Sequence, residues 1–93
     1  MTRQVLQSPL FERQKKHLLK KEIIRLDEEI RTIQDDAAIG EAKRGDLAGV
    51  YVHKFKIEKR LFLLAYEYTE REILLLAMGP HENFYRDLKR YLE

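Results

Sequence analysis

The stretch that decides the fold reads VYVHKFKIEKRLFLLAYEYTEREILLLAMGP and runs from residue 50 to residue 80. Its first eight residues fit a period of two, most clearly at 54–57, where polar and apolar side chains alternate, and two later runs are strongly apolar. Short polar turns at 58–59 and 69–71 separate these runs, which predicts three consecutive strands at 50–57, 60–68 and 72–78. The alternation also assigns two faces to the first strand. One face carries Val50, Val52, Lys54 and Lys56, and the other carries Tyr51, His53, Phe55 and Ile57.

The residues before this stretch predict one short strand and two helices. Residues 4–7 predict the strand, and Ser8 followed by proline is typical of a helix N-terminus. Apolar residues at helical spacing predict helices at about 9–19 and 22–36. A single long helix is the alternative, because no strong helix breaker separates the two.

The remaining segments complete an α+β domain. Three of the four glycines fall within residues 40–49, which predicts a loop, and residues 81–92 predict a short helix. The expected fold class is therefore α+β, a small antiparallel sheet of about four strands with an N-terminal helical hairpin and a short C-terminal helix. The 93 residues of the chain are enough for one domain, which we expect to span residues 1–93.

Composition narrows the possible functions. The chain has no cysteine and three histidines, which excludes a disulfide scaffold and argues against a histidine-only zinc site. The longest apolar run, 61–66, is too short to cross a membrane, so we expect a cytoplasmic protein with no membrane partner. Residues 53–60 hold four Lys or Arg residues against one Glu, and such a patch attracts polyanions. The alternative is a sheet edge with lysines that prevent aggregation.

A small set of basic and aromatic residues is the only candidate site. Lys54 and Lys56 share a strand face, while His81 follows the last strand and Tyr85 lies four residues later, one helical turn on. If these four groups converge, they suit cleavage of RNA without a metal or another cofactor, because the ribose 2′-hydroxyl is the nucleophile. Each group also has a structural interpretation: solvent-facing lysines, a helix-capping histidine and a core tyrosine.

The second half of the chain resembles the RelE-like toxins of bacterial type II toxin–antitoxin systems, within the RelE/ParE superfamily. The resemblance is carried by GDLAG at 45–49, YVHKFK at 51–56, RLFLLAY at 60–66, ILLLAMG at 73–79 and HENFYR at 81–86. It implies a small antiparallel sheet with a helical hairpin and an endoribonuclease that cuts mRNA in the ribosomal A site. It further implies an antitoxin protein, the ribosome and mRNA as partners.

The resemblance also implies roles for individual residues. Lys54 and Lys56 match paired lysines that bind the phosphate, His81 matches a basic residue that acts as general acid or phosphate ligand, and Tyr85 matches a base-stacking aromatic. Arg60 and Arg86 are the further residues that we expect to contact RNA. One position departs from the pattern, because Leu63 stands where the family often has an arginine.

The departure at Leu63 leaves the activity open. Strand parity turns Arg60 away from the side of Leu63, so the phosphate clamp is either weaker than usual or supplied by Arg86 or His53. Two alternatives to the ribonuclease therefore stand: a ParE-like inhibitor of DNA gyrase without nuclease activity, and a catalytically degenerate member of the family.

Overall fold

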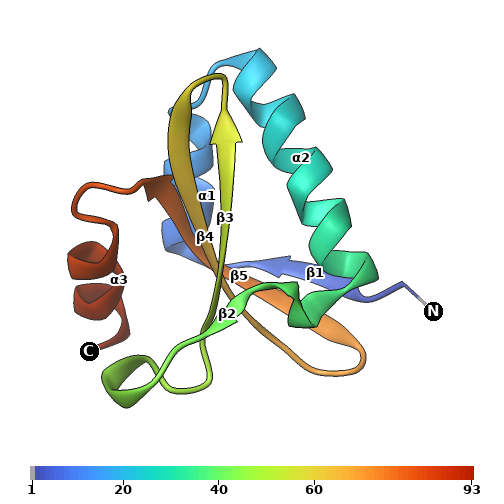
Figure 1. Ribbon diagram of the computed structural model, residues 1–93, viewed down its shortest axis with the longest axis vertical. Coiled ribbons are helices and arrows are strands. Elements are labelled where there is room, and N and C mark those ends of the chain that lie inside the picture. The colour runs from blue at the N-terminus through green and yellow to red at the C-terminus, as the bar shows by residue number, and fades with distance from the viewer. Residues whose placement is uncertain (1) are drawn as a thin grey trace.

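The computed structural model describes residues 2–93, and Met1 lies outside it (Figure 1). Its central feature is a five-stranded sheet in the order β1-β5-β4-β3-β2. The three predicted strands are confirmed as β3 (Tyr51–Ile57), β4 (Arg60–Tyr68) and β5 (Glu72–Pro80), each antiparallel to the next.

Two edge strands differ from the expected sheet. The predicted first strand is confirmed as β1 (Gln4–Gln7), but it pairs with β5 in parallel, so the sheet is mixed rather than antiparallel. The predicted loop at 40–49 contains a fifth strand, β2 (Glu41–Ala42), which is antiparallel to β3. Short 3₁₀ turns, η1 (Ala37–Ile39) and η2 (Gly45–Leu47), flank β2 on either side.

The N-terminal helices form the predicted hairpin, and the single long helix is wrong. In α1 (Pro9–Lys16), the Ser8 hydroxyl accepts a hydrogen bond from the Phe11 N–H at 3.0 Å, as the helix-start pattern predicts. The chain then turns, and α2 (Lys20–Asp35) begins after Leu19, whose extended backbone caps the helix. The Glu22 carboxylate accepts a hydrogen bond from the Leu19 N–H at 2.7 Å, which satisfies a donor outside the helix.

Each face of the sheet has its own apolar core. On one face, α1 and α2 pack on β3, β4 and β5; this core includes Phe11, Leu26, Ile33, Phe55, Phe62 and Tyr66. The opposite face is covered by the C-terminal helix α3 (Phe84–Leu92), where Phe84 and Leu88 pack on Leu63 and Ala65. Figure 1 shows α3 and α2 on different sides of the sheet. The two faces of β3 therefore lie in different environments.

The C-terminal helix begins later than the sequence pattern predicts. Strand β5 continues to Pro80, and Asn83 has a left-handed backbone with φ of 62°, so α3 starts only at Phe84. The helical spacing of Phe84 and Leu88 is confirmed by their burial, whereas Tyr91, the third member of that series, is 37% exposed. No helix among the described residues combines the length and apolar character that a membrane crossing needs.

Candidate functional site

Lys54 and Lys56 lie on the face of β3 that points toward α3. Both side chains are exposed, whereas Phe55 between them is buried on the hairpin side, which confirms the predicted faces of β3. Their direct neighbours on β4 are Leu63, opposite Lys54, and Leu61, opposite Lys56. Among residues 2–93, no carboxylate forms an ion pair with either ammonium group. Both lysines are therefore accessible to an anion from solvent.

A second charged cluster, formed by Glu41 and Lys43, adjoins this surface. Glu41 pairs with Val52 and so points to the same face of the sheet as Lys54. The Lys43 ammonium lies 3.1 Å from the Glu41 carboxylate and 5.0 Å from the centre of the Tyr85 ring. The hydrogen bond from Lys43, its charge and the more distant charge of Lys54 hold the pKa of Glu41 below its usual value, against a smaller effect of burial.

The position of Lys43 could not be read from the sequence pattern. Residues 41–43 alternate in the manner of a strand, but that signal covers only three positions in a glycine-containing segment. The backbone places Lys43 beside β3, because its N–H donates to the carbonyl of Val50 at 2.9 Å. Contact with the Tyr85 side chain and with Glu41 raises the pKa of Lys43, while burial lowers it by less.

His81 lies at the far end of β5, close to the row that contains Lys56. Its N–H donates to the Leu61 carbonyl at 3.3 Å, and Leu61 pairs with Lys56 on the next strand. Two strand spacings separate the backbones of Lys56 and His81, which is about 10 Å. The expected helical turn from His81 to Tyr85 is wrong, because the left-handed Asn83 stands between them and His81 precedes α3.

The two arginines that we expected to contact RNA make other contacts in the structure. Arg60 stacks on the ring of Phe62, at 5.3 Å from its centre, and Phe62 belongs to the core under the helical hairpin. Arg60 nevertheless reaches the end of the sheet, where it and His81 line the same hollow of about 400 Å³. Arg86 is exposed and lies 3.3 Å from Asp87, its neighbour on α3.

Comparison with known proteins assigns the chain to a family. Residues 5–89 match the family described as the ParE-like toxin of type II bacterial toxin–antitoxin systems. The chain is a member of this toxin family. Toxins of type II toxin–antitoxin systems act together with an antitoxin, so membership of this family implies an antitoxin protein as the partner of the chain. A search of curated protein sequences found no match.

The fold of the toxin is also that of a solved relative. A structure of a mutant of the E. coli toxin RelE in the free state superimposes with a TM-score of 0.75. The alignment covers 100% of both chains at 13% sequence identity. At that level of identity the likeness concerns the fold alone. The function of the surface around Lys54 and Lys56, which we call the lysine surface, must therefore be inferred from the toxin's own residues.

In this toxin, Leu63 is part of the core rather than of an open surface. Its side chain is fully buried and packs in the same apolar cluster as Phe84 and Leu88 of α3. The helix therefore covers the position where the resemblance leads us to expect an arginine. A cation at this position would lie beneath α3, which explains in physical terms why leucine fits here.

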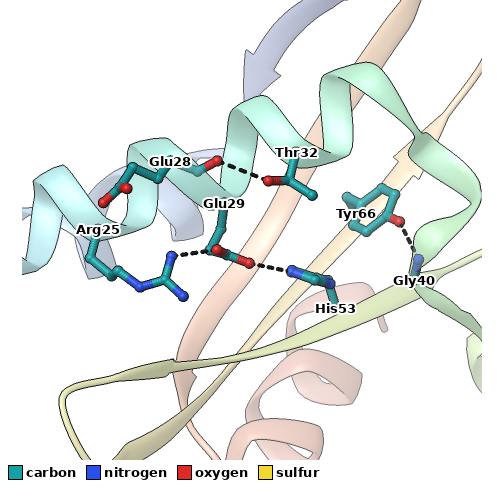
Figure 2. A network of polar contacts seen from close by, with 7 residues as sticks. All are labelled: Arg25, Glu28, Glu29, Thr32, Gly40, His53 and Tyr66. Carbon is teal, nitrogen blue, oxygen red and sulfur yellow. Dashed lines mark hydrogen bonds and ion pairs between the residues drawn. The ribbon is translucent and has the colours of Figure 1, made fainter.

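His53 cannot supply the missing cation, because it faces the other side of the sheet. Its Nε2 lies 2.5 Å from the Glu29 carboxylate of α2, and Arg25 contacts the same carboxylate (Figure 2). Strand parity had indicated this orientation, and the structure confirms it. Burial raises the pKa of Glu29, but Arg25 and His53 together lower it by more, so the carboxylate is held below its usual range.

Within the part of the chain that the structure describes, no three His, Asp or Glu side chains come together as metal ligands. The candidate groups at this surface and beside it are the ammonium groups of the lysines, the imidazole of His81, the phenol of Tyr85 and the carboxylate of Glu41. Of these, the ammonium groups suit a phosphate and the phenol ring suits a nucleobase.

Proposed function

We propose that this toxin is an endoribonuclease that cuts mRNA on the ribosome without a metal ion. The observation that carries the proposal is the exposed pair Lys54 and Lys56, which has no ion-pair partner among residues 2–93. His81 lies at one end of this lysine surface and Tyr85 at the other. The surface therefore offers cations for a phosphate, a group that can carry a proton and a ring for a base.

The chemistry follows from these groups. The 2′-oxygen attacks the neighbouring phosphorus as its proton passes to solvent, and the bond from phosphorus to the 5′-oxygen breaks. Protonated His81 donates its proton to that oxygen, so one fragment ends in a 2′,3′-cyclic phosphate and the other begins with a 5′-hydroxyl. Lys54 and Lys56 stabilise the additional negative charge on the phosphate oxygens in the transition state.

Mapping of mRNA 5′ ends after induced expression of the toxin tests the proposal. We expect new ends inside translated codons, in register with the reading frame. The double variant Lys54→Ala with Lys56→Ala should fold and should cut on the order of 10²-fold less often, because the transition state loses two cations. The matched control is Lys16→Ala with Lys20→Ala, which removes two exposed lysines from the helical hairpin and should cut like the wild type.

The match to a ParE-like family favours one second candidate, an inhibitor of DNA gyrase. The same expression experiment separates the two activities. Intact mRNA together with a loss of DNA supercoiling would replace the ribonuclease with the gyrase inhibitor. Wild-type cutting by the Lys54 and Lys56 double variant would instead keep the nuclease and refute this surface as its site.

A further inference from the structure

We propose that Lys43 is a positioning residue that holds the Tyr85 ring at the edge of the lysine surface, ready to stack on a base of the RNA. This inference rests on the proposed ribonuclease function and adds a residue to its machinery. Lys43 directly follows β2, a strand for which the sequence offers only a three-residue alternation, and it belongs to no motif of the sequence.

The contacts of Lys43 are those of a held side chain rather than a free surface lysine. Its side chain is only 19% exposed, although lysine is rarely buried. Its ammonium lies 3.1 Å from Glu41 and 5.0 Å from the centre of the Tyr85 ring, within the range of a cation–π contact. A hydrogen bond of 2.9 Å from its N–H to Val50 ties its backbone to β3.

The Tyr85 ring is partly buried and packs against the apolar core beneath α3. The ring of Phe84 meets it edge to face, with centres 5.2 Å apart, and Phe84 itself is buried. Lys43 supplies a second contact, which comes from a different element of the fold. The ring is thus held by the core beneath α3 and by the segment that directly follows β2, which limits its rotation before RNA arrives.

The ion pair with Glu41 is the reason that we assign Lys43 to the Tyr85 ring rather than to the phosphate of the RNA. The Glu41 carboxylate pairs with Lys43, which balances the charge of the ammonium group and orients it. Lys54 and Lys56 have no such partner among the described residues. We therefore assign the phosphate to the two strand lysines and the ring to Lys43.

The activity test compares Lys43→Met with Lys43→Arg on programmed ribosomes. Methionine keeps the length of the side chain without its charge, whereas arginine keeps a cation that stacks on aromatic rings. We expect Lys43→Met to lower kcat by about 10- to 100-fold with little change in KM, because a misplaced base slows the chemical step. Lys43→Arg should restore most of kcat.

The salt dependence of ribosome binding separates positioning from phosphate binding. The affinity falls as salt rises, and the loss of one phosphate contact makes the slope of log affinity against log salt less steep by about 0.7 for a single strand. We expect this change for Lys54→Ala and not for Lys43→Met. A wild-type kcat in Lys43→Met, or a slope reduced as in Lys54→Ala, would overturn the positioning role.

An NMR measurement on the free toxin tests the contact between Lys43 and Tyr85 without RNA, so it is informative even if the toxin cuts no mRNA. Ring currents of Tyr85 should shift the side-chain proton resonances of Lys43 upfield in the NMR spectrum of the free toxin. Tyr85→Phe should keep that shift and Tyr85→Leu should abolish it. An unshifted Lys43 in the wild type refutes this inference, whereas a shifted Lys43 in a toxin that leaves mRNA intact refutes the proposed function alone.

Discussion

Replacing Leu63 with arginine should destabilise the toxin rather than improve it, although the resemblance to RelE-like toxins places an arginine at this position. Leu63 is fully buried between β4 and α3. The substitution loses about 1.5–3 kcal/mol of apolar burial. It also places a guanidinium among apolar side chains, which adds several kcal/mol unless α3 moves away.

The total loss is large for a domain of this size. We expect Leu63→Arg to lower the free energy of unfolding by at least about 4 kcal/mol, out of the 5–15 kcal/mol that such domains possess. For a chain of fewer than 100 residues this corresponds to a fall in Tm of roughly 15 °C or more. Thermal and urea unfolding followed by circular dichroism measures both quantities.

The matched control is Leu61→Arg, two residues earlier on the same face of β4. Leu61 is only partly buried, and its neighbour on β3 is the exposed Lys56. We expect this variant to lose no more than about 1 kcal/mol, mainly through repulsion between neighbouring cations. If Leu63→Arg were as stable as Leu61→Arg and cut mRNA faster than the wild type, α3 would not seal this position and the reasoning would fail.

Three further predictions concern polar groups of the toxin. Tyr66→Phe should lower the unfolding free energy by about 1–3 kcal/mol in urea titrations, because the Tyr66 hydroxyl donates to the Ala37 carbonyl at 2.6 Å and accepts from the Gly40 N–H at 3.0 Å; Figure 2 shows the contact with Gly40. The pKa of Glu29 is held below its usual value of 4.5, so its contribution to stability is present above that pH and lost as the pH falls further. Unfolding followed from pH 6 to about pH 3 should therefore show a steeper loss in the wild type than in Glu29→Gln, and parallel curves would contradict this. Tyr85→Phe should keep measurable cleavage and Tyr85→Ala should lose most of it, because stacking needs the ring and not the hydroxyl; equal rates would remove Tyr85 from the site.

Much of the architecture could be predicted from local patterns. A period of two at 50–57, two apolar runs and two polar turns indicated β3, β4 and β5, and the same period separated Lys54 and Lys56 from His53. Ser8 before proline marked the start of α1. These features depend on residues close in sequence, so a single window of the chain contains the information that determines them.

Other features depend on contacts between distant segments. The two residues of β2 gain their strand character from β3, and β1 pairs in parallel with β5, about 70 residues later in the chain. The start of α3 depends on Pro80 continuing β5 and on the left-handed Asn83, which helical spacing from His81 onward did not indicate.

The sequence by itself determined which side chains β3 presents together, and hence the lysine pair. Only the tertiary structure decided what surrounds that pair. The packing of α3 buries Leu63, and the pairing of β2 with β3 brings Lys43 to Tyr85, 42 positions away in the chain. Burial and cation–π contact are properties of surfaces that meet in space, so no periodicity along the chain encodes them.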